Sequence, residues 1–497
     1  MYPNQLTLET LESQHCEYVQ LLPALQEIDL LISGGYKLKN AIRHFLPQRP
    51  GEEPEIYETR LKKHTYLNIL STNINEQVSK LANAPMTVDG LEINPKFWSA
   101  FREDTDLAGR SEKNLITLIF RELLKFKKVF IHVDKNKSEV APKNKAQEEA
   151  LGLRPYTVSY SPIQVINWSE SKGKLNWLKI RQISEDNSNP IATPRKVCTW
   201  TIIDDAYVVK YSAIVELDSK GTITKVNSEM INADTTISLL TPPIEHGFGT
   251  VPVFKIELPD QLWVADQAAS KALEHLRTDC SKYDLLTMAY FQRTFKRIQT
   301  PDSDLEKSYT NDEPLPTGLA HVVEVEKFEW SEPHGYMIEH ISNSLQAIEN
   351  QVRDLISAGG VSSSNGAVTQ SGVSKQMDFA KQESMLRAYG EIIIDFYQDL
   401  LQLVAKAAGI DGSKISVTGL NSFENDTLDS VLMKLDSVSK LNVESLKANL
   451  PPSALKVIYE QMVALLTGNL SASQKEQVNK EIEVLLASIK TGDTFIV

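Results

Sequence analysis

Carboxylate, hydroxyl and imidazole side chains are the groups in this sequence that could do chemistry. Asp302, Asp304 and Glu306 stand close to Asp312 and Glu313 along the chain. Carboxylates at this spacing could hold a hard cation such as Ca²⁺ or Mg²⁺. The alternative is a solvated acidic loop that holds no ion, and it is the interpretation we favour.

A nucleophile with a general base is harder to find. Ser374 follows a Gly-rich segment, but the sequence places no histidine partner beside it. His246 stands beside Gly247 and Gly249, which is typical of a turn residue. The motifs GxxxxGK[ST], GxGxxG, HExxH and GxSxG do not occur. We therefore expect no enzyme: no catalytic residue, no cofactor-binding residue and no metal ligand.

Length and composition indicate a globular chain of several domains. The 497 residues suggest about three domains, and 41% hydrophobic with 24% charged residues excludes wholesale disorder. The net charge of −13 excludes a basic protein that wraps nucleic acid, because such wrapping depends on Lys and Arg at phosphates.

Three widely spaced cysteines, Cys16, Cys198 and Cys280, exclude a disulfide scaffold and fit a reducing compartment. The first thirty residues carry five acidic side chains and no Lys or Arg, so we expect no signal peptide. No apolar run approaches the ~18 residues of a membrane helix, and we expect no membrane partner. These features predict a protein made and kept inside a cell.

The elements that must position any site alternate between helical and strand-like segments. Apolar residues recur at helical spacing over 54–84, 94–101 and 111–127, and the first quarter of the chain reads as helices. A short strand is expected at 129–133, and the polar stretch 134–149 reads as an exposed loop. Short β-branched and aromatic runs over 156–258 predict an antiparallel sheet or small barrel.

Two long helices follow, over 262–297 and 338–358, and they flank a strand-like insert that includes 314–330. The segment GGVSSSNGAVTQSG at 359–372 cannot propagate a helix, so it predicts a flexible loop before another long helix at 373–408. About three further helices are expected in the tail. The fold class is therefore α+β, mainly helical.

The two flanking helices carry apolar stripes that are long for the core of one subunit. Two long helices joined by a compact insert form a projecting hairpin, which lateral packing in an oligomer would stabilise. The alternative is an internal helical bundle in a monomer. Periodicity alone does not separate the two.

Several segments, spread over about 55–490, resemble the portal proteins of tailed bacteriophages. IQVINWSESKGKLNWLKIRQISE at 163–185 resembles a wing-domain strand pair, and HGFGTVPVF at 246–254 resembles the strand before the first stem helix. The segment 314–360 resembles the clip and the returning stem helix. The Gly/Ser loop with VSKQMDFAKQESMLRAYGEIIIDFYQDLLQLVAKAAG resembles the tunnel loop and the helix behind it.

The resemblance implies a portal-like fold with an α/β wing, a helical stem hairpin, a small α/β clip and a helical C-terminal crown. It assigns the following ranges: wing 1–261, with a β region at about 129–258; stem helix 262–297; clip 298–335; returning stem helix 336–358; tunnel loop 359–372; long wing helix 373–410; crown 411–497.

The resemblance also implies a function in the virion. Portal subunits form a ring, expected to have twelve copies, at one capsid vertex, and double-stranded DNA enters and leaves through its channel. The implied partners are other copies of the chain, the terminase large subunit, adaptor and tail proteins, the major capsid protein and, as a further candidate, scaffolding protein. Assembly would take place in the host cytoplasm.

Candidate site residues follow from these assignments. In the tunnel loop, DNA would meet only hydroxyl, amide and backbone groups, which bind phosphate weakly and without sequence preference; the alternative is a linker on the outer surface. These residues are Ser362, Ser363, Ser364, Asn365, Thr369 and Gln370.

Near the clip, Arg293, Lys296 and Arg297 either touch DNA or pair with acidic residues of a neighbour. Phe328 and Trp330 are expected in a clip interface, because exposed aromatic side chains gain from burial between subunits. Two other function classes stay open from the residues alone: an enzyme whose site lies in the 156–258 sheet, and another kind of oligomeric assembly protein.

Overall fold

The chain divides into two compact units, Met1–Ser422 and Phe423–Val497, and every element described below belongs to the first. Among the described helices, none has the length and apolar composition that crossing a membrane would require. The computed structural model describes residues 2–135, 153–191, 193–218, 221–232, 234–291, 294–296, 327–329, 335–357, 372–421 and 423.

Helices dominate the first 126 residues, as the spacing of apolar residues predicts. Side-chain caps set their starts: Asn68 accepts a hydrogen bond from the Ser71 amide, and Ser111 accepts one from the Asn114 amide. The helices are α1 Leu8–Glu12, α2 Cys16–Ser33, α3 Gly35–Asn40, α4 Ile42–Phe45, α5 Pro54–Lys63, α6 Ile69–Asn83, α7 Pro95–Glu103 and α8 Glu112–Phe126.

The strand-like middle of the chain forms an antiparallel sheet, as its pattern predicts, in the order β1-β11-β8-β7-β6-β5, with β9 also pairing with β8 and β10 pairing with β9. Buried side chains of its strands include Ile180, Trp200, Val209 and Tyr211. The N-terminal strand β1 completes one edge by pairing with β11, a contact that the helical reading of the first quarter missed. The strands are β1 Gln5–Thr7, β5 Val165–Ser171, β6 Lys174–Asp186, β7 Arg195–Ile203, β8 Tyr207–Leu217, β9 Ile223–Val226, β10 Glu229–Met230 and β11 Thr236–Glu245.

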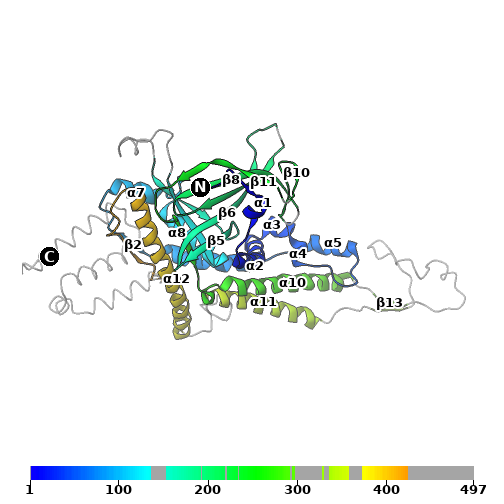
Figure 1. Ribbon diagram of the computed structural model, residues 1–497. Coiled ribbons are helices and arrows are strands. Elements are labelled where there is room, and N and C mark those ends of the chain that lie inside the picture. The colour runs from blue at the N-terminus through cyan, green and yellow to red at the C-terminus, as the bar shows by residue number, and fades with distance from the viewer. Residues whose placement is uncertain are drawn as a thin grey trace, which may run out of the picture. The chain divides into compact units, whose positions relative to one another are not determined.

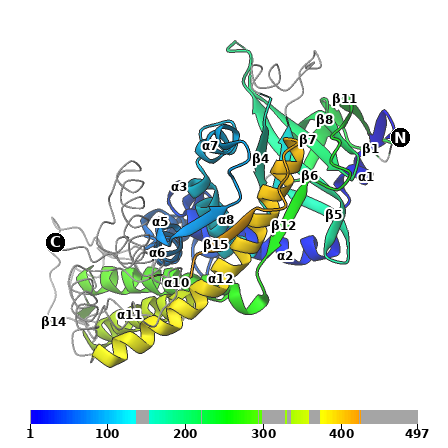
Figure 2. The same ribbon diagram turned by 90° about the vertical axis from the view of Figure 1, so that its left-hand side faces the viewer.

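A second, three-stranded sheet has the order β12-β3-β4, with β12 Val253–Glu257, β3 Lys128–Lys135 and β4 Pro155–Tyr160. Figure 2 shows the long helix α12, Gly372–Ala407, running past this sheet, and Phe254 meets Phe396 edge to face with ring centroids 5.6 Å apart. The strand-like region therefore builds two sheets rather than one.

Two long helices, α10 Val264–Phe291 and α11 Gly335–Ser357, pack against each other (Figure 1). A short turn of 3₁₀ helix, Asp260–Leu262, precedes α10. The helix ends at Phe291 rather than at 297, because Thr294–Lys296 is extended and pairs as β13 with β14, Lys327–Glu329. Thr294 and Phe295 are β-branched and aromatic, which favours the strand over the last helical turn.

The described region after α12 contains a strand that the sequence did not predict. Its described start is not helical: β15, Ser416–Gly419, pairs antiparallel with β2, Met86–Asp89. Gly90 and Gly419 have φ of +85° and +119°, and a side chain at either would overlap the backbone opposite. The helices expected in the C-terminal crown lie outside the described residues, so the crown stays a prediction.

Candidate functional site

The helices α10 and α11 form the hairpin that the sequence analysis considered as the stem of an oligomer. Leu276 of α10 is buried, as are Leu345, Ile348 and Val352 of α11. His275 Nε2 lies 3.4 Å from Glu349 Oε1 across the pair. The hairpin also packs on α2, α6 and α8, so the part of it that contacts these helices belongs to the body of the unit.

The alanine-rich stripe of α10 is buried within the chain itself. Ala265, Ala268, Ala269 and Ala272 are between 0% and 4% exposed. The sequence suggested that such a stripe would pack against copies of the chain, but here it allows close approach of helices within one subunit. The internal bundle is thus correct for this half of the helix.

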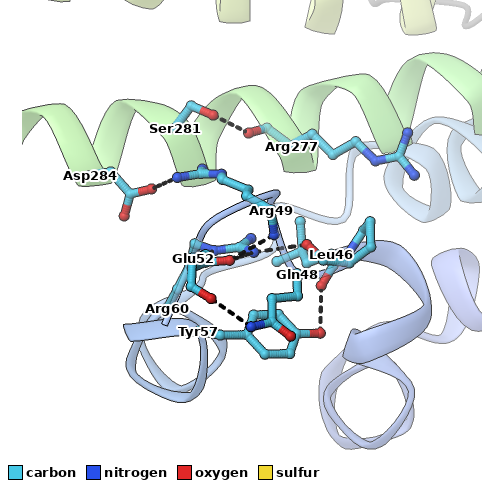
Figure 3. Close-up of polar contacts among 10 residues, drawn as sticks. Leu46, Gln48, Arg49, Glu52, Tyr57, Arg60, Arg277, Ser281 and Asp284 are labelled. Carbon is cyan, nitrogen blue, oxygen red and sulfur yellow. Dashed lines mark hydrogen bonds and ion pairs between the residues drawn. The ribbon is translucent and has the colours of Figure 1, made fainter. Parts of the chain in front are cut away.

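The segment between α4 and α5 contacts the middle of α10, as Figure 3 shows. We call Arg49, Glu52 and Arg60 the clamp. Arg60 is 7% exposed, and its Nε and Nη2 donate to the two carboxylate oxygens of Glu52, each at 2.8 Å. Arg60 Nη2 also donates to the Pro47 carbonyl at 2.9 Å, and the Arg49 amide donates to Glu52 at 2.9 Å. A planar guanidinium matches a carboxylate in this way, whereas an ammonium does not.

The electrostatics of the clamp keep both partners ionised. The Arg60 hydrogen bonds, followed by the Arg49 amide, lower the pKa of Glu52 from 4.5 to about 2. The same contact with Glu52 raises the pKa of Arg60. Burial raises the pKa of the nearby Cys280 thiol, which makes it a poor nucleophile.

Three contacts join this clamp to α10. Arg49 Nη1 lies 2.9 Å from Asp284 Oδ2, and Arg277 Nε donates to the Phe45 carbonyl at 3.1 Å. Farther along, Thr65 Oγ1 donates to Asp279 Oδ2 at 3.0 Å. The loop and the helix therefore hold each other in a fixed register.

A cleft of about 230 Å³ lies between α5 and α10, over the clamp. Ligand sites for drug-sized molecules usually measure roughly 300–1,000 Å³, so this cleft suits one or two side chains better than a small molecule. Its lining mixes charges of both signs with apolar groups: Arg49, Glu52, Ile56, Thr59, Arg60, Lys63, His64, Thr65, Asp279, Cys280, Tyr283 and Asp284.

Few of the site residues expected from the sequence fall on described residues. Lys296 lies in β13 opposite Lys327, and Phe328 lies in β14 opposite Phe295. The rest lie outside the described residues: Arg293, Arg297, Trp330 and the tunnel-loop residues Ser362, Ser363, Ser364, Asn365, Thr369 and Gln370. The roles assigned to all of them stay predictions.

Among the described residues, those considered for chemistry form no catalytic arrangement. His246 lies in the loop between β11 and β12: its Nε2 contacts the Asp204 carbonyl at 3.0 Å, and its Nδ1 accepts from the Phe248 amide at 3.2 Å. The acidic residues at 302–313 lie outside the described part of the chain, and within that part no group of three or more His, Cys, Asp or Glu could hold a metal ion.

The Arg60–Glu52 pair was not predicted from the sequence. Arg60 stands among charged residues near the end of an exposed helix, and nothing in that spacing singles it out. The one available signal is Tyr57 one turn before it, over whose ring the Arg60 guanidinium lies at 5.2 Å.

Comparisons with known proteins find similarity in solved structures alone. No family model matches the chain, and no curated protein matches it. One similar structure is described as "Virion of native gene transfer agent (GTA) particle", with 9% identity, a TM-score of 0.36, and coverage of 78% of this chain and 89% of that chain. Another is "Neck of empty GTA particle computed with C6 symmetry", with 10% identity, a TM-score of 0.40, and coverage of 79% and 89%. At such identities and TM-scores neither likeness assigns a function.

Proposed function

We propose that this chain is a structural protein of a phage-like particle, and more closely that it is the subunit of a portal ring. The ring would stand at one capsid vertex and conduct double-stranded DNA during packaging and ejection. The terminase large subunit would dock on it first, and adaptor or tail proteins afterwards.

One structural observation carries the proposal. Two long helices, α10 and α11, run side by side out of the same body, and the chain between them begins and ends in the paired strands β13 and β14. The resemblance to portal proteins implies this order of elements: a stem hairpin with a strand-bearing clip between its two helices.

Charge supports a conduit rather than a DNA-binding protein. A channel wall must not hold its cargo, and each Lys or Arg on a phosphate adds affinity that falls with salt. The chain carries a net charge of −13, and the segment 359–372 contains no Lys or Arg. That segment joins α11 to α12, where the resemblance places the tunnel loop.

Electron microscopy of the purified full-length chain tests the proposal. Class averages of negatively stained particles should show end-on rings of about twelve subunits around an open channel. Particles without a channel, or a chain that stays monomeric at micromolar concentration, would contradict it.

DNA passage tests the tunnel-loop assignment separately. Changing Ser363 and Asn365 to Lys should add phosphate contacts in every subunit and slow packaging, with the defect easing as salt rises. A double variant that forms normal rings and packages at the wild-type rate in low salt would place the loop on the outer surface.

A further inference from the structure

The cleft between α5 and α10 has an apolar edge that the fold leaves open, with an exposed lysine beside it. Ile56 is 57% exposed and Tyr283 is 45% exposed, although both line a concave surface. Lys63 is exposed at the same cleft and forms no ion pair with any described residue. Exposed apolar side chains in a hollow, beside a charge without a counter-ion, are typical of a surface that another protein covers.

A surface of complementary character lies on the first two turns of α11. Tyr336 is 82% exposed and Met337 is 54% exposed. Glu339 is exposed one turn after Tyr336, and it too has no ion pair within the described part of the chain. The exposed residues of α11 include Glu339 and Asp354 but no Lys or Arg, so Glu339 offers Lys63 of the cleft an opposite charge.

The two surfaces lie on opposite sides of α10. Both views show α5 on one side of α10 and α11 on the other (Figures 1 and 2). Thr65 binds Asp279 on the first side, and Glu349 approaches His275 on the second. A chain therefore cannot bring its own α11 face to its own cleft, whereas a second copy can.

We propose that Tyr336 and Met337 of one copy insert into the α5–α10 cleft of the next copy, where Glu339 pairs with Lys63. The proposal rests on the ring inferred above and names the contact that repeats around it. Two different patches that match each other form a heterologous interface, which closes into a ring when the rotation between copies permits. The volume of about 230 Å³ suits these side chains.

A charge swap tests the contact in the full-length chain. Lys63→Glu and Glu339→Lys each place like charges opposite each other, and each should lower the ring fraction at least tenfold at a fixed chain concentration in low salt. Combining the two changes restores an attractive pair, so the double variant should recover most of the rings. Analytical ultracentrifugation measures the fractions, and circular dichroism checks that each chain folds.

Lys62→Glu is the matched control, because Lys62 is the adjacent exposed lysine of α5 and does not line the cleft. It should assemble as the wild type does. If the wild type forms rings and the single variants do so equally well, the docking contact is wrong while the ring stands. The contact is also wrong if the double variant assembles no better than the single ones. A wild-type chain that forms no ring overturns both proposals.

Disulfide cross-linking between copies tests the contact independently of charge. In a background with Cys16→Ser and Cys280→Ser, which removes the exposed native thiol and the thiol that lines the cleft, Lys63→Cys with Glu339→Cys should give a ladder of covalent multimers under oxidation. Either cysteine alone should give no ladder beyond dimers. Monomers from the double variant would overturn the contact.

Discussion

Arg60 holds Glu52 through two parallel hydrogen bonds of 2.8 Å, in a position where both side chains are almost fully covered. The pair fixes the loop that carries Arg49 against α10. A buried pair of this kind is costly to break from one side only, since the remaining charge stays without a partner.

The fork geometry of Arg60 should therefore matter more than its charge. We expect Arg60→Lys to lower the midpoint of thermal unfolding by several degrees, because an ammonium cannot reach both Glu52 oxygens and the Pro47 carbonyl. Arg43→Lys is the control, since its pair with Glu58 is exposed on both sides and such pairs contribute about 0–1 kcal/mol. Equal midpoints of thermal unfolding for the two variants would show that the Arg60–Glu52 pair does not stabilise the fold.

The buried alanines give a second prediction. Ala272→Trp should destabilise the folded chain by about 3 kcal/mol, the upper end of the usual cost of overpacking, because Ala272 is 0% exposed within one chain. Ala347→Trp, on the exposed face of α11, should unfold as the wild type does. Urea denaturation of monomeric chains separates the two; a folded, stable Ala272→Trp monomer would restore the idea that this stripe packs between subunits.

The buried position of His132 predicts that the folded chain loses free energy of unfolding in acid. It is 3% exposed on β3, its ring stacks on Tyr160, and neither ring nitrogen has a hydrogen-bond partner among the described residues. Burial lowers its pKa from 6.5 to about 4, with Asp134 opposing the shift and His246 and Lys210 adding to it.

The unfolded chain therefore takes up the proton first as pH falls. Stability should decline from pH 6.5 to about 4 by an amount on the order of 2–3 kcal/mol, and His132 should cause no further loss below that range. His132→Phe should flatten the decline, and His44→Phe, which replaces an exposed histidine, should not. An unchanged profile in His132→Phe would assign the acid sensitivity elsewhere.

Gly390 marks a close approach of α12 to the chain after β15. A methyl group there would overlap the carbonyl oxygen of Leu420. Gly390→Ala should thus destabilise by about 1–3 kcal/mol, although Ala gains ~1 kcal/mol over Gly in helix propensity. Glu391→Ala, at the exposed neighbouring position, should be close to neutral in the same denaturation experiment. Stabilisation by Gly390→Ala would mean that the contact with Leu420 is not tight.

Elements with strong local periodicity could be predicted from the sequence, and long-range pairings could not. The stripe through Leu70, Ile74 and Leu81 predicts α6, and these side chains are buried. The pairing of β2 with β15 joins four-residue strands more than 300 positions apart, and such short segments carry little pattern of their own.

The end of α10 shows a second limit of the sequence. Apolar residues continue at helical spacing as far as Phe295, yet the helix ends at Phe291 and Phe295 pairs in a strand. Strand pairing with residues 327–329 outweighs local helix propensity there, and the partner strand cannot be identified from periodicity. The clamp around Arg60 was missed for a related reason, because its partners come from a loop and a distant helix.

The mass of the native particle tests the ring most directly. Twelve chains of 55.7 kDa give a particle of about 670 kDa, which native mass spectrometry distinguishes from neighbouring subunit numbers. We expect the full-length chain to give a main species near that mass, with no populated dimer or trimer at micromolar concentration. A main species at 55.7 kDa, or at twice that mass, would contradict a portal ring.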